Sequence, residues 1–147
     1  MSTTGLLALM AGAMIALQAS MNAKLGLMLN NSVIATVVAF ACSCFFSLIL
    51  LAVLPKPLPA LAAIKSVPIF LWFTGGLLAA TGVGLFYFLI PKMGIGPMMS
   101  YALTGQLLVA LAASHWGWFN LPEKPITPLK LVGACSLVLG ILLINKE

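Results

Sequence analysis

The sequence has very few charged residues, and acidic ones are nearly absent. Only 6% of its 147 residues are charged, with no Arg, no Asp and two acidic residues, Glu123 and Glu147. A soluble domain carries about a quarter charged residues, so this chain has no surface suited to water on every side. Sets of a nucleophile, a base and an acid are also missing, and we therefore expect no catalytic residues and no enzyme activity.

The side chains that bind metals or nucleic acids are equally scarce. There are three Cys and one His. Cys42 and Cys44 would point about 160° apart on a helix, and Cys135 stands alone, so we expect no metal site and no cofactor. The net charge of +5 comes from lysines scattered singly at the ends of apolar runs. Lysines in such places anchor helices at the membrane surface, whereas nucleic-acid binding would need them on one face.

Long apolar runs are what the sequence has in abundance, since 63% of its residues are hydrophobic. None of the five runs contains a carboxylate, and they cover Gly5–Met21, Val33–Leu54, Ile69–Ile90, Pro97–Ser114 and Leu129–Ile144. Each holds about 20 residues, enough to cross a hydrocarbon core of roughly 30 Å. In lipid the backbone must satisfy its own hydrogen bonds, so each run should be helical. The sequence therefore predicts an all-α, polytopic membrane protein with five transmembrane helices.

We expect these helices to form a single domain over residues 1–147, at about 5–28, 32–54, 68–90, 96–114 and 128–145. The first run has no basic leader and four more runs follow it, so we expect a retained helix rather than a signal peptide. The segment Pro55–Pro59 should be stiff and extended, and Pro91–Pro97 should be a tight turn. Trp72, Phe86, Tyr87 and Phe88 lie towards the two ends of the third run, as an aromatic belt at the membrane surface would.

Uncharged polar side chains inside the apolar runs are the candidate binding residues. Gln18 and Asn22 lie four apart on one face of the first helix, either as glue between helices or as the wall of a substrate cavity. Tyr101 and Gln106 lie on the fourth helix, where Gln106 is near the middle. His115 is the only histidine, and histidine ordinarily titrates near neutrality, so it is the best candidate to carry a proton.

Two further patterns concern packing and assembly. A ridge of small residues, Ala8, Gly12, Ala16 and Ser20, would allow another helix to approach closely. Five crossings place four lysines (Lys56, Lys65, Lys124, Lys130) on one side and three (Lys24, Lys92, Lys146) on the other. Orientation normally follows an excess of Lys and Arg on the cytoplasmic side. This balance predicts insertion both ways and an antiparallel homodimer of ten helices, with a weak preference for a cytoplasmic N-terminus as the fallback.

Several motifs resemble the bacterial YdcZ-like proteins, five-helix members of the drug/metabolite transporter superfamily. They are Gln18-Ala19-x-x-Asn22-Ala23-x-Leu25-Gly26, Gly105-Gln106-Leu107-Leu108, His115-x-Gly117-Trp118, Pro125-Ile126-Thr127-Pro128-Leu129, and Gly133 with Gly140-Ile141-Leu142. The resemblance implies half of an inverted-repeat transporter in the bacterial inner membrane, paired with itself or with a paralogous subunit. The family pattern often has an acidic residue before the histidine, where this chain has Ser114, so a proton role for that pair is not carried over.

Together these features predict a transporter subunit that moves a small polar or cationic metabolite by alternating access. Gln18, Asn22, Tyr101 and Gln106 would bind the substrate, because carboxamide and hydroxyl groups both donate and accept hydrogen bonds without charge. The alternative is a membrane scaffold or accessory subunit without transport activity, in which the same polar residues would only join helices.

Overall fold

The computed structural model describes residues 2–54, 58–120 and 122–146, and helices are its only regular elements over these ranges. The chain divides into two compact units, Met1–Lys92 and Met93–Glu147, and each is described by itself. The expected extended exit at Pro55–Pro57 lies outside the described residues.

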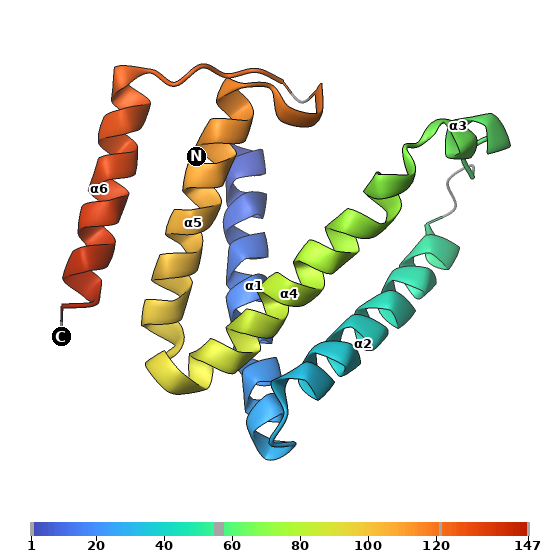
Figure 1. Ribbon diagram of the computed structural model, residues 1–147, viewed down its shortest axis with the longest axis horizontal. Coiled ribbons are helices and arrows are strands. Elements are labelled where there is room, and N and C mark those ends of the chain that lie inside the picture. Colours follow the sequence, from blue (N-terminus) through green and yellow to red (C-terminus); the bar gives the residue numbers. More distant parts are fainter. Residues whose placement is uncertain (1, 55–57, 121, 147) are drawn as a thin grey trace. The chain divides into compact units, whose positions relative to one another are not determined.

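The first unit contains four helices, α1 (Thr3–Met28), α2 (Ser32–Val53), α3 (Leu61–Ser66) and α4 (Ile69–Met93) (Figure 1). Side chains that accept hydrogen bonds from the free N–H groups of the first turn stabilise a helix start. Ser2 does this for α1, where its Oγ accepts from the N–H of Gly5 at 3.2 Å. Asn31 does it for α2, accepting from Val33 and Ile34 at 2.9 and 3.1 Å.

Small residues bring α1 and α2 together. Ala19, Ala23 and Gly26 are the buried residues of α1. A Cβ atom on Gly26 would lie 3.3 Å from the Cα of Ser32 and 3.5 Å from the Cβ of Ala35. This is the close backbone approach that small residues allow in membranes. The packed face therefore differs from the predicted ridge, in which Ala8 and Gly12 are exposed and Ala16 and Ser20 are half-buried.

In Figure 1, α2 and α4 lie side by side. A Cβ atom on Gly84 of α4 would lie 3.4 Å from Oγ1 of Thr36 of α2. Thr36 is buried, and its hydroxyl donates to the carbonyl of Ser32 at 2.9 Å, so its polar atom is satisfied within its own helix. The two helices thus approach through small or internally satisfied residues.

The second unit contains α5 (Ile95–His115), the short 3-10 helix η1 (Trp118–Asn120) and α6 (Pro128–Ile144). Thr127 caps α6 by accepting from the N–H of Lys130 at 3.3 Å, with a proline at the start of the helix. Asn145, at the end of α6, donates from Nδ2 to Oγ of Ser100 on α5 at 2.9 Å. This bond joins the end of α6 to the beginning of α5.

The expected tight turn at Pro91–Pro97 is wrong in extent. Helix α4 continues through Pro91 to Met93, and α5 begins at Ile95, so Gly94 alone separates the two helices. Pro91 has no N–H to donate to the carbonyl four residues before it, and its ring crowds that carbonyl, so it weakens α4 just before the helix ends. Gly94 has a φ of 87°, a conformation that glycine adopts without strain. The short α3 is a helix that the apolar pattern did not predict.

Within the described parts of the chain, four helices, α1, α2, α4 and α5, are long and apolar enough to cross a membrane, and α6 is a shorter apolar helix of 17 residues. Their apolar side chains are largely exposed, as expected for helices that face lipid rather than water. The protein is therefore an all-α, polytopic membrane protein.

Candidate functional site

Three polar side chains meet between α1 and α4: Tyr87 is buried, Asn22 is half-buried and Gln18 is exposed. Nδ2 of Asn22 donates to Oε1 of Gln18 at 2.9 Å and to the hydroxyl oxygen of Tyr87 at 3.0 Å. The Tyr87 hydroxyl donates to the same Oε1 of Gln18 at 3.1 Å. We call this closed set of Gln18, Asn22 and Tyr87 the polar triad.

Local geometry explains the α1 part of the triad. Residues four apart lie above one another on a helix face, so the Gln18 and Asn22 carboxamides are neighbours by spacing alone. Gln18 precedes the end of α1 by about 15 Å at 1.5 Å per residue, which is half the thickness of a hydrocarbon core of roughly 30 Å.

Tyr87 is the member that sequence reasoning missed. Its side chain is only 2% exposed and bonds to α1, so its assignment to an aromatic belt is wrong. A buried tyrosine hydroxyl normally finds a hydrogen-bond partner. In the sequence, a tyrosine in an apolar run together with two carboxamides in another run could have indicated that the Tyr87 hydroxyl pairs with Gln18 and Asn22.

The triad leaves some hydrogen-bonding capacity unused. Oε1 of Gln18 already accepts two hydrogen bonds. Among the residues that the structure describes, no protein group pairs with Nε2 of Gln18 or with Oδ1 of Asn22. A carboxamide provides two donors at nitrogen and two lone pairs at oxygen. The triad therefore offers both a donor and an acceptor to a ligand while its other atoms hold the geometry.

A hollow of about 250 Å³ adjoins the triad and is lined by α1, α2 and α4. Its polar side chains are Gln18, Ser43 and Tyr87, and the rest of its wall is Ala39, Phe40 and Val83. Drug-sized ligands occupy pockets of about 300–1,000 Å³, so this hollow suits a smaller molecule. It combines hydrogen-bonding groups with two aromatic rings, those of Phe40 and Tyr87.

The structure places Tyr101, Gln106 and His115 on α5, in the second unit. Tyr101 and Gln106 are exposed, and their part in substrate binding stays a prediction. Nδ1 of His115 accepts a hydrogen bond from the N–H of Ile126 at 3.3 Å, which ties the end of α5 to the loop before α6. The predicted proton-carrying role of His115 stays untested beside this structural role.

The comparisons with known proteins add a family to this geometry. Residues 3–143 match the family model described as "Putative inner membrane exporter, YdcZ". No curated protein and no solved structure matches the chain. The match extends from the first residue of α1 nearly to the end of α6, so it covers both units.

Proposed function

Since this chain belongs to the YdcZ family of inner membrane exporters, we propose that it exports a small polar or cationic metabolite that binds at the polar triad. Membership makes the protein a transporter of the inner membrane rather than an enzyme. The observation that carries the proposal is the free donor on Gln18, which lines a hollow between three helices together with Ser43 and Tyr87, while Asn22 holds Gln18 and Tyr87 in place.

The chemistry of the triad selects the substrate class. The first unit contains no Asp or Glu, so it has no carboxylate to form an ion pair with a strong cation. Carboxamides and hydroxyls suit a neutral or zwitterionic metabolite. The faces of Phe40 and Tyr87 can attract a positively charged group at about 0.5–2 kcal/mol per contact. A small amine, amino acid or quaternary ammonium compound meets these conditions.

Assembly as an antiparallel homodimer is part of the same proposal. The lysine balance across the membrane supports insertion in both orientations. The exposed ridge at Ala8 and Gly12 is available to a second copy. We take α6 as the fifth crossing, because its 17 residues are at the lower limit of about 17–25 residues for a transmembrane helix. Each copy would contribute one domain of five helices, and two inverted copies would form a transporter of ten helices. Alternating access would come from rocking of the two halves.

Transport by the purified protein tests the function. We would screen uptake into proteoliposomes with radiolabelled amines, amino acids and quaternary ammonium compounds. For a transported compound, Gln18→Leu and Asn22→Leu should each reduce the rate at limiting concentration about tenfold, since one hydrogen bond to the substrate contributes about 1.4 kcal/mol at the upper end. Ser136→Ala is the matched control, because the Ser136 hydroxyl only donates to Val132 within α6 at 2.8 Å.

Two results would contradict the proposal. If transport by Gln18→Leu and Asn22→Leu equals that of Ser136→Ala, the triad is not the substrate site. If no compound is transported while the protein purifies with an unrelated membrane protein, the chain is an accessory subunit.

Orientation tests the dimer separately. Cys42, Cys44 and Cys135 would be replaced by Ala, and single cysteines placed at Lys65, which precedes α4, and at Lys92, in its last turn. Partial labelling of each site in intact cells by a membrane-impermeant maleimide would support the antiparallel dimer. Complete labelling of one site and none of the other would show one-way insertion and refute it.

A further inference from the structure

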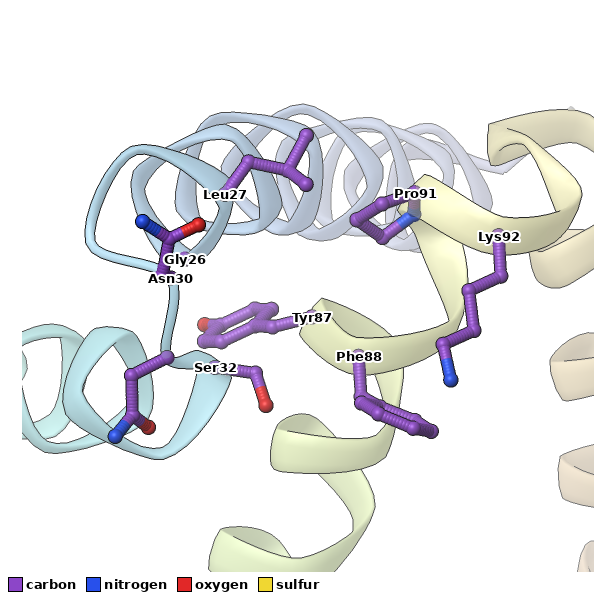
Figure 2. Close-up of a pocket in the computed structure, with 9 residues that line it drawn as sticks. Gly26, Leu27, Asn30, Ser32, Tyr87, Phe88, Pro91 and Lys92 are labelled. Carbon is purple, nitrogen blue, oxygen red and sulfur yellow. The ribbon is translucent and has the colours of Figure 1, made fainter.

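A second cavity of the first unit lies at the ends of three helices, and of the polar triad it is lined by Tyr87 but by neither Gln18 nor Asn22. It has a volume of about 530 Å³. The end of α1, the turn at Asn30 and Asn31, the start of α2 and the last turns of α4 line it (Figure 2). Ends of membrane helices lie at the level of the lipid headgroups. We call this space the headgroup cavity.

Among the described residues that line the headgroup cavity, Lys92 is the one that carries a charge. Its Nζ lies 3.5 Å from the centre of the Phe88 ring, a cation–π contact that fixes the ammonium group beside the cavity. Figure 2 shows both side chains leaving α4 on the same side. No Asp or Glu occurs between Met1 and Lys92, so no carboxylate of this unit neutralises the lysine. The cavity also presents the Asn30 carboxamide and the Ser32 hydroxyl.

An apolar groove of about 660 Å³ adjoins this cavity between α2 and α4. The two spaces share Ser32 and Phe88 in their walls. The groove follows α4 from Phe88 back to Ala80, about 12 Å at 1.5 Å per residue. Its walls are apolar side chains such as Val37 and Leu85, and Leu85 is 54% exposed. The groove therefore leads from a positively charged cavity at headgroup level towards the middle of the membrane.

From this continuity we propose that the headgroup cavity and the groove together bind one anionic glycerophospholipid. Its phosphodiester lies against Lys92, Asn30 and Ser32, and one acyl chain lies between α2 and α4. Basic pockets between transmembrane helices recognise anionic headgroups in this way. The charge favours a lipid of net charge −1, such as phosphatidylglycerol, over phosphatidylcholine, whose quaternary ammonium cancels the phosphate charge and would meet the Lys92 ammonium.

Lipid-specific fluorescence quenching tests this site. Trp72, Trp116 and Trp118 would be replaced by Phe, and Leu85→Trp would place one reporter in the groove. The protein would be reconstituted with phosphatidylglycerol or phosphatidylcholine that is brominated on its acyl chains. The site beside the reporter should bind phosphatidylglycerol about fivefold more strongly than phosphatidylcholine. This factor corresponds to about 1 kcal/mol for one lysine near the membrane surface.

Two substitutions separate a specific site from a general attraction to anionic membranes. Lys92→Gln should abolish the preference for phosphatidylglycerol. Lys24→Gln is the matched control, because Lys24 belongs to the last turns of α1 but is not among the residues that line the cavity, and it should leave the preference unchanged. Circular dichroism would verify that both variants keep their helices.

Four outcomes would overturn the proposal. The first is equal quenching by the two lipids. The second is an equal loss of preference in Lys92→Gln and Lys24→Gln, which would show diffuse surface charge. The third is a preference that persists in Ala80→Phe, whose side chain fills the groove, because no acyl chain would then be held there. The fourth is a preference that millimolar inorganic phosphate removes where chloride of equal ionic strength does not, because the site would then bind a free anion rather than a lipid.

Discussion

Removing the hydroxyl of Tyr87 while keeping its ring isolates the hydrogen bonds of the polar triad. In Tyr87→Phe, Gln18 loses a donor at 3.1 Å and Asn22 loses an acceptor at 3.0 Å. Hydrogen bonds between membrane helices contribute about 0.6 kcal/mol on average and at most about 1.7 kcal/mol. Two such bonds predict a loss of about 1.2 kcal/mol in the free energy of unfolding, or roughly eightfold in the equilibrium constant.

Tyr101→Phe provides a matched control for the same chemical change. Tyr101 is 51% exposed, and its hydroxyl has no hydrogen-bond partner among the described residues, so its loss should cost less than about 0.5 kcal/mol. Reversible unfolding in mixed detergent micelles, followed by circular dichroism at increasing dodecyl sulfate, would give the free energy of unfolding of each variant.

A double-mutant cycle makes the test specific to the pair. Tyr87→Phe and Asn22→Ala, alone and combined, should show a coupling energy of about 0.6 kcal/mol, since the bond between them is lost in either single variant. If Tyr87→Phe unfolds like Tyr101→Phe and the coupling energy is zero, the hydroxyl makes no bond to α1. The triad would then not exist as described, and the substrate site that rests on it would be lost.

Two further predictions concern the packing of each unit. Gly26→Leu should destabilise the protein by about 1–3 kcal/mol, because its Cβ would lie 3.3 Å from the Cα of Ser32. Gly76→Leu is the control, because a Cβ there has no atom within 4 Å and the stability should not fall. Thermal unfolding of both variants tests this. Asn145→Ala should cost about 1–2 kcal/mol by removing its bond to α5, and a loss no greater than that of Ser136→Ala in the same measurement would contradict that role.

The sequence by itself determined the class of the protein and the positions of its apolar helices. Hydrophobic runs without carboxylates leave the backbone no alternative to helices in lipid. It also placed Gln18 and Asn22 on one face, because a spacing of four is a property of any helix. The starts of α2 and α6 are also encoded locally, since Asn31 and Thr127 are good N-cap residues.

The tertiary structure alone decided which side chain completes the triad. Tyr87 lies far along the chain from Gln18, and its place depends on how α4 packs against the other helices of the first unit. Periodicity describes one helix at a time, and a span with apolar residues on every side has little amphipathic signal to say which face is turned inward. For the same reason, the small residues that pack, Ala19, Ala23 and Gly26, are not the ridge that the spacing favoured.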